Sequence, residues 1–256
     1  MKKILRVLLR IIITIFILVM SYIGINEGMA LYTQDKISAE LLDTSERYIF
    51  MENREQEQKI TDSFNAVLDQ IPDQFAKKFK SQWIVVVAEH PPYEMSKLAT
   101  IPSEKIAGLT LHSGKAIWIS SDIDELYVSV FAHEIGHFIA YELRGTDYSE
   151  TFYKIYEKYK DSYVQYGTET VSIYDSSTPN EFYATLCKEY ICHPDYLKEH
   201  CIEGFEYIKT DFSQNPYSFF LSGYINEFLS TAYNIKAQIA NNIQIYENLL
   251  NPKNPK

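Results

Sequence analysis

The first apolar stretch of the chain, Ile11 to Ile25, follows a basic start formed by Lys2, Lys3, Arg6 and Arg10. This order is typical of a secretory signal or of an uncleaved membrane anchor. A spanning helix needs about 20 apolar residues, and basic side chains that extend towards the lipid surface would lengthen the span to residues 4–26. Small residues allow cleavage after Ala30, so residues 1–30 are either a signal peptide or an anchor. Both alternatives place the rest of the chain outside the cytoplasm, secreted or membrane-anchored.

Beyond this stretch, apolar and charged residues interleave at helical spacing over residues 36–80. Residues 31–80 are therefore predicted as a helical segment, either a stalk or part of the next domain. The β-branched run from Trp83 to Ala88 predicts a buried strand. Residues 109–119, which turn at Ser113-Gly114, predict a β-hairpin. Residues 93–107 are predicted as an irregular loop.

The downstream half is predicted to be mainly helical. A capping pattern at Ser121 and Asp124 predicts a long helix to about Leu143 that stops at Arg144-Gly145. Another helix is predicted to start at Thr178-Pro179. Strands beside helices, without β-α-β alternation, indicate an α+β fold. We expect one main domain over residues 81–250 and a disordered tail over residues 251–256.

Composition narrows the classes of function. The chain has 256 residues, 46% of them hydrophobic, which is ample for a globular core. The net charge of −10 and the lack of a basic stripe disfavour binding to nucleic acid. The chain contains three cysteines but no CxxC pair, so a thiolate zinc knuckle is not expected. A Cys192–Cys201 bridge and unpaired thiols both remain open.

The string His133-Glu134-Ile135-Gly136-His137 carries the clearest chemistry in the sequence. Histidines at i and i+4 project from one face of a helix and can share one zinc ion. Glu134 is placed to hold a zinc-bound water rather than the zinc itself. The surrounding helix is apolar on nearly all sides, so its ionisable groups need a compensating cation. The alternative is a pair of core histidines with satisfied hydrogen bonds.

A zinc site of this type needs a third protein ligand. The extended HExxHxxGxxH pattern is excluded because Ala140 and Leu143 stand at its glycine and histidine positions. Glu181, at the start of a later helix, is the best candidate, although its place after Thr178 is also that of a capping box. The next choice is Glu189. The remaining histidines are predicted as surface or loop residues: His90, His112, His193 and His200.

These residues together resemble the anthrax lethal factor-like metallopeptidases, in particular their Pro-Pro endopeptidase branch. The resemblance spans residues 106–207 and includes the hairpin, the HExxH string and a Tyr-x4-Pro-x-Glu-Phe-Tyr-Ala spacing that starts at Tyr174. It implies a zincin-like fold, in which a small twisted sheet lies over the active-site helix and a helical C-terminal subdomain closes the cleft. It also implies that His133, His137 and Glu181 are the zinc ligands.

In the same family pattern Glu134 would be the general base and Tyr174 a hydroxyl donor to the oxyanion. The chain departs from the pattern at Thr185 and Ala140, where the family often has acidic residues, and this puts outer support of the ligands in doubt.

We therefore expect an extracellular zinc-dependent endopeptidase with one Zn²⁺ ion. Its partners would be protein or peptide substrates, held by β-augmentation along residues 108–112. The resemblance implies a preference for proline at the scissile bond. Two alternatives remain: a metallopeptidase of another glutamate-ligand family, and a catalytically silent surface binding protein on the same fold.

Overall fold

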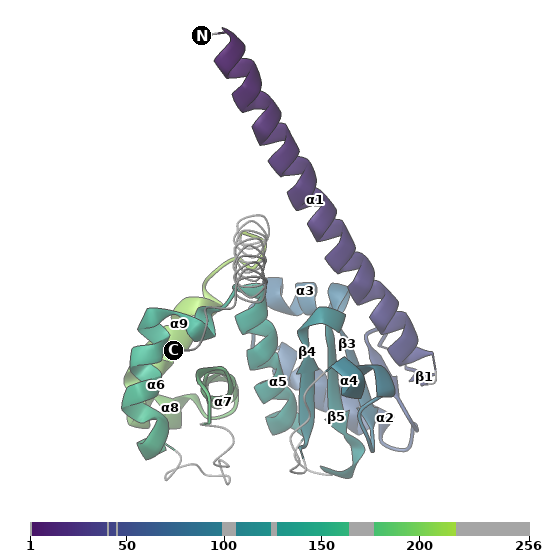
Figure 1. The fold of residues 1–256 in the computed structure, drawn as a ribbon. Coiled ribbons are helices and arrows are strands. Elements are labelled where there is room, and N and C mark those ends of the chain that lie inside the picture. The colour runs from purple at the N-terminus through teal and green to yellow at the C-terminus, as the bar shows by residue number, and fades with distance from the viewer. Residues whose placement is uncertain are drawn as a thin grey trace, which may run out of the picture. The chain divides into compact units, whose positions relative to one another are not determined.

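The computed structural model describes residues 2–39, 41–44, 46–98, 106–123, 127–163 and 177–218. The chain divides into two units, one of residues 1–25 with 220–256 and the other of residues 26–219. Helix α1 (Lys2–Ser38) contributes to both units. All the other helices and strands labelled in Figure 1 belong to the second unit.

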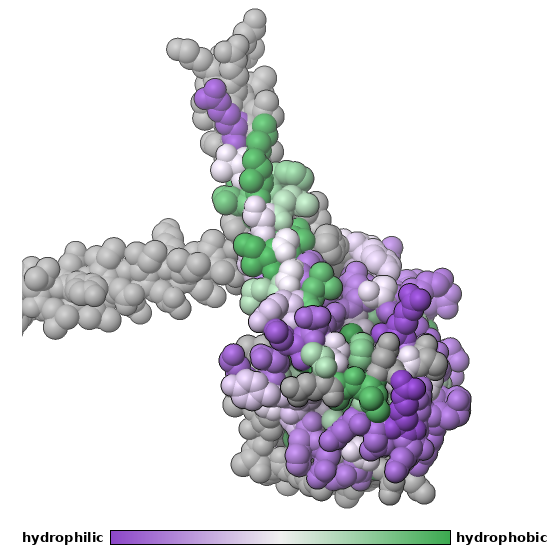
Figure 2. Space-filling view, turned by 90° about the vertical axis from the view of Figure 1, so that its right-hand side faces the viewer, coloured by the Kyte–Doolittle hydropathy of each residue, from purple (hydrophilic) through white to green (hydrophobic). Residues whose placement is uncertain are grey.

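In the first unit, α1 carries exposed apolar side chains such as Phe16 and Ile17. Figure 2 shows hydrophobic residues, in green, along the described part of this helix. The segment Ile13–Ser38 is long and apolar enough to cross a membrane, a property that signal sequences share. A position outside the cytoplasm therefore stays a prediction.

The second unit contains one five-stranded mixed sheet in the order β1-β2-β3-β5-β4. The inner strands β2 (Ile49–Met51), β3 (Ile84–Ala88) and β5 (Ala116–Ser120) run parallel. The outer strands β1 (Leu42–Asp43) and β4 (Gly108–Leu111) pair antiparallel to their neighbours. This confirms the predicted buried strand and the predicted hairpin, and it leaves β4 as the last strand of the sheet.

Three predictions from the sequence are wrong. The segment over residues 31–80 is only partly helical: α2 (Glu57–Leu68) and α3 (Asp73–Gln82) form, but β1 and β2 interrupt it. The path from β2 through α2 and α3 to the parallel β3 is a β-α-β crossover, which the sequence pattern did not indicate. Part of the predicted loop over residues 93–107 forms α4 (Tyr93–Leu98). Elements as short as β1, β2 and α4 carry little periodicity that a sequence pattern could reveal. For β1 and β2, pairing with neighbouring strands determines that a strand forms.

Helices cover both faces of the sheet. On one face Val85, Val87 and Ile117 join a core with α2, α3 and α5 (Tyr127–Glu142), which is rich in aromatic rings. On the other face Val86 and Trp118 pack with residues of α1 and α4. Apolar residues between positions 48 and 79 belong to the first of these cores, together with residues of the downstream helices. The structure therefore favours the view that residues 48–79 are part of the same domain and not a separate stalk.

Helix α5, which carries the HExxH string, lies between the sheet and a group of four further helices. Helix α5 lies beside β4 on one side and beside α7 (Pro179–Cys192) on the other (Figure 1). Around α7 pack α6 (Glu150–Tyr163), α8 (Pro194–His200) and α9 (Ile202–Phe212). Short 3-10 turns occupy His112–Gly114, Ser121–Ile123 and Thr146–Tyr148. This mixture of helices and sheet agrees with the predicted α+β class.

The boundaries of α5 agree only partly with the predicted capping pattern. After Glu142 the chain turns through left-handed conformations at Arg144 (φ 61°) and Gly145 (φ 88°), which confirms the predicted stop. At the other end Ser121 lies in a 3-10 turn, and Asp124 falls outside the described residues. The predicted tail over residues 251–256 also falls outside them.

Candidate metal centre

Three side chains from α5 and α7 converge. His133, His137 and Glu181 each offer one ligand atom, and these atoms lie within 4.8 Å of one another. Oε2 of Glu181 lies 3.2 Å from Nε2 of His133 and 3.5 Å from Nε2 of His137. The structure thus brings together the three residues that the sequence analysis selected as ligands.

The donor set fits a zinc ion. Two histidine nitrogens and one carboxylate oxygen are a common protein ligand set of catalytic zinc, whose fourth position stays open. Ligand atoms about 2.0–2.1 Å from one tetrahedral ion lie roughly 3.3–3.4 Å apart. The separations of 3.2 and 3.5 Å bracket that value. The three ligand side chains are between 8% and 16% exposed, so the negative charge of Glu181 is poorly solvated and a bound cation would compensate it.

Glu181 reaches this place because α7 begins there. Thr178 is the N-cap, and its side-chain oxygen accepts a hydrogen bond from the backbone N–H of Glu181 at 3.2 Å. Pro179 occupies the first turn, where the missing N–H costs nothing. The predicted cap therefore forms through the backbone of Glu181, while the carboxylate turns towards the histidines. The two roles weighed for Glu181 are compatible.

The close approach of the two helices depends on Gly136. A Cβ atom at this position would lie 2.6 Å from Cα of Ala184 and 3.0 Å from Cβ of Cys187. Glycine usually costs about 1 kcal/mol in a helix interior. Here it lets the backbone of α7 lie against α5, which carries Glu181 to the histidines.

Each histidine also has a partner on its second nitrogen. Nδ1 of His137 lies 2.9 Å from Oδ1 of Asn180, and Nδ1 of His133 lies 3.5 Å from Oγ1 of Thr185. An Nδ1–H that donates to Asn180 leaves Nε2 of His137 available as a ligand. Thr185 stands where the family often has an acidic residue, and here its hydroxyl lies beside His133 as a polar neighbour. The sequence analysis missed Asn180, although it directly precedes the candidate ligand.

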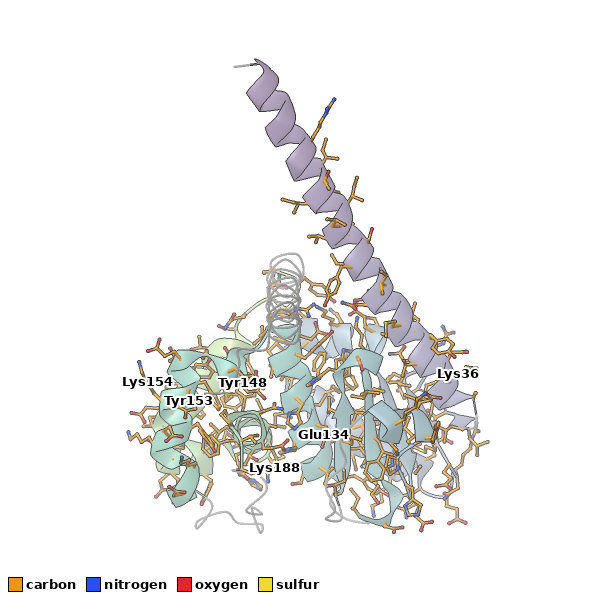
Figure 3. All side chains as sticks on the ribbon, viewed as in Figure 1. Lys36, Glu134, Tyr148, Tyr153, Lys154 and Lys188 are labelled. Atoms are coloured by element: carbon orange, nitrogen blue, oxygen red, sulfur yellow. The ribbon has the colours of Figure 1, made fainter. Side chains whose placement is uncertain are left out.

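Glu134 lies on the sheet side of α5 and is 5% exposed. The hydroxyl of Thr110, on β4, donates a hydrogen bond of 2.6 Å to Oε2 of Glu134. A Cβ atom at Gly108 would lie 2.5 Å from Oε1, so a larger residue there would push the carboxylate out of its present position. In Figure 3 Glu134 lies between α7 and the strands of the sheet. Thr110 and Gly108 are further site residues that the sequence analysis did not single out.

The electrostatics of the metal-free site show how strongly these groups interact. Burial raises the pKa of Glu134, and the charges of His137 and His133 partly offset this. Burial alone would lower the pKa of His137, but its hydrogen bond to Glu181 and the charge of Glu134 outweigh this and raise the pKa to about 9. Hydrogen bonds from both histidines overcome burial and hold the pKa of Glu181 well below its usual range. Without metal, a proton on His137 supplies positive charge beside Glu181.

The other candidates lie elsewhere. Glu189 is buried, but its Oε2 bonds Nδ1 of His193 at 2.9 Å, so it does not reach the cluster. His112 begins the short turn His112–Gly114 between β4 and β5, which agrees with its prediction as a loop residue. It stacks on Tyr141, and burial lowers its pKa to about 4. Tyr174, the predicted hydroxyl donor, falls outside the described residues.

Two further histidines and the cysteines also take no part in the cluster. His90 is exposed beside Glu89, and His200 bonds the backbone oxygen of Tyr196. All three cysteines are free thiols, with Cys187 and Cys201 buried, and the Cys192–Cys201 bridge is not formed.

Comparison of the sequence with protein-family models and with curated proteins found no match. The lethal factor-like resemblance therefore stays an expectation from the residues quoted above.

Proposed function

We propose that the chain is an extracellular zinc-dependent endopeptidase with a zincin-like fold. The observation that carries this proposal is the position of the Glu181 carboxylate within 3.2 and 3.5 Å of the two HExxH histidine nitrogens. Chance HExxH strings occur in unrelated proteins. A third ligand delivered from a separate helix, with polar partners on both histidines, is much harder to obtain by chance.

Each part of the site has a role in peptide-bond hydrolysis. A zinc ion bound by His133, His137 and Glu181 would polarise the scissile carbonyl and lower the pKa of its water. Glu134 accepts the proton of the attacking water and passes it to the leaving amine. Thr110 holds one carboxylate oxygen of Glu134 by a hydrogen bond of 2.6 Å and so limits its rotation. Tyr174 remains the predicted hydroxyl donor to the developing oxyanion.

Strand β4 supplies a place for the substrate. It is the last strand of the sheet in the order β1-β2-β3-β5-β4, and it carries the Thr110 contact to Glu134. An extended peptide added to this edge would pass directly beside the general base. A preference for proline at the scissile bond rests on the family resemblance.

A peptide library that includes Pro-Pro sequences tests this function. The wild-type chain should cleave a defined subset, and Glu134→Gln should lose at least 100-fold in turnover while keeping its zinc, because the general base contributes about 10²–10⁴-fold. Cleavage of other bonds alone would indicate another metallopeptidase specificity. If wild type and Glu134→Gln are equally inert across the library, the catalytically silent binding protein is the correct interpretation.

A further inference from the structure

The C-terminal part of α1 is tied to the sheet of the second unit. The side-chain amide of Gln34 donates to the backbone oxygens of Gln82 at 2.8 Å and Lys115 at 3.0 Å. Ile37 is 2% exposed and belongs to the core on that face of the sheet. Residues 26–38 are therefore an integral part of the folded domain.

An ion pair strengthens this attachment. Nζ of Lys115 lies 2.6 Å from Oε2 of Glu27, and the side chain of Lys115 is only 7% exposed. The same Nζ lies 3.3 Å from Oε1 of Gln82. A buried lysine needs a negative partner, and removal of one member of such a pair is strongly destabilising. Glu27 thus matters to the stability of the sheet although it lies far upstream.

Cleavage after Ala30 would remove this partner. Glu27 would be lost, and Ala30 itself, only 4% exposed, would become a new chain end in a helix. Lys115 would then lack the carboxylate that lies 2.6 Å from its Nζ. A signal peptide is normally separate from the mature fold, whereas here the residues before the cleavage site help to build it.

The upstream part of α1 has the opposite character. No charged residue occurs from Ile11 to Asn26. Several apolar side chains there are about half exposed, as for Phe16 at 57% and Ile17 at 56%, while Val19 and Ile23 are buried. Residues 4–26 form a helix about 34 Å long, which suffices for a hydrocarbon core of about 30 Å. The basic residues before it are those that stay on the cytoplasmic side.

We propose that α1 is retained as a membrane anchor, with a lipid bilayer around residues 4–26 and residues 26–38 docked on the sheet. Helix α1 runs from Lys2 to Ser38 and so includes both segments. The docked domain is thereby held at the outer membrane surface, where its partners would be polypeptides displayed at or near that surface. This inference does not depend on the peptidase activity.

Fractionation of cells that express the full chain tests retention. The protein should stay with membranes after alkaline carbonate extraction, and its intact mass should include residues 1–30. Soluble secreted protein that begins at Leu31 would overturn the proposal.

A pair of matched variants tests the docking. Glu27→Gln should lower the Tm of the detergent-solubilised full chain and increase proteolytic cleavage within residues 27–38. Asp35→Asn makes the same change of carboxylate to amide at an exposed position of the same helix and should match wild type. Equal Tm and equal proteolysis for the two variants would show that α1 is not docked through Glu27. Lys115→Met should cancel the sensitivity to Glu27→Gln in the double variant, and an undiminished effect would also contradict the proposal.

Discussion

Gly136→Ala is the most informative small change in this protein, because it adds one methyl group at the contact between α5 and α7. The new Cβ would lie 2.6 Å from Cα of Ala184. Carbon atoms in contact normally lie about 3.5–4.0 Å apart, so the helices must separate by roughly 1 Å. Since α5 carries the two histidines and α7 carries Glu181, this separation acts directly on the ligand set.

The magnitudes indicate that function will suffer more than stability. Overpacking costs about 1–3 kcal/mol, and alanine regains about 1 kcal/mol over glycine in a helix interior. The net loss in the free energy of unfolding should be about 0–2 kcal/mol. A displacement of about 1 Å at a catalytic site can reduce turnover about 100-fold. Zinc affinity and peptide turnover should therefore fall well beyond what the change in stability explains.

Calorimetric unfolding, zinc titration and turnover measured on the same preparations test this reasoning. Gly28→Ala is the matched control, because Gly28 also lies inside a helix but its added Cβ would meet nothing within 4 Å. The control should keep wild-type zinc affinity and turnover. Wild-type zinc affinity and turnover in Gly136→Ala would refute the claim that close contact at this glycine positions the third ligand.

Three other predictions follow from individual contacts. Thr110→Val removes the 2.6 Å hydrogen bond to Glu134, and a hydrogen bond to a charged group is worth about 1.5–3 kcal/mol. Turnover should therefore fall about 10- to 150-fold in Thr110→Val, while Thr110→Ser keeps most of it. Equal turnover in both variants would contradict this. In wild type, Nζ of Lys78 lies 2.6 Å from Oε2 of the buried Glu142, and Lys78→Met leaves this carboxylate without its cation. The free energy of unfolding, measured with denaturant, should fall by about 3–5 kcal/mol. A fall below about 1 kcal/mol would be inconsistent with a stabilising ion pair. The pKa of His137 is raised from 6.5 to about 9 without metal, so its contribution to the stability of metal-free protein is complete below pH 6.5 and is lost as the pH rises through 9. Zinc binding at neutral pH should accordingly release about one proton from this residue, measurable by titration calorimetry in buffers of different ionisation enthalpy, and no release would mean that His137 is already neutral.

The parts of the fold that sequence reasoning found are those with strong local patterns. Helix α5 has a long apolar face and a glycine stop, β3 is a β-branched run, and β5 follows turn residues in the predicted hairpin. Strand β2 has only three residues, and it exists because it pairs with β3 across two intervening helices. No local pattern in Ile49–Met51 distinguishes such a strand from the end of a helix.

The residues of the candidate site also fall into those that a local sequence pattern reveals and those that depend on contacts between distant segments. The spacing of His133 and His137 is local to one helix and was readable from the sequence, and Glu181 was readable as a candidate because it opens a later helix. Whether its carboxylate would cap α7 or face the histidines depends on the contact at Gly136, which joins distant segments. Thr110 lies 24 residues from Glu134 in the chain, so their hydrogen bond had no sequence signal beyond the predicted edge strand.

The zinc content of Glu181→Ala, compared with wild type after identical purification and dialysis, tests the central claim most directly. The account predicts close to one zinc ion per wild-type chain and a large loss in the variant, which should still be folded by circular dichroism. Near-wild-type zinc in folded Glu181→Ala would contradict the proposed ligand set, and wild-type protein without zinc affinity would contradict the metal centre itself.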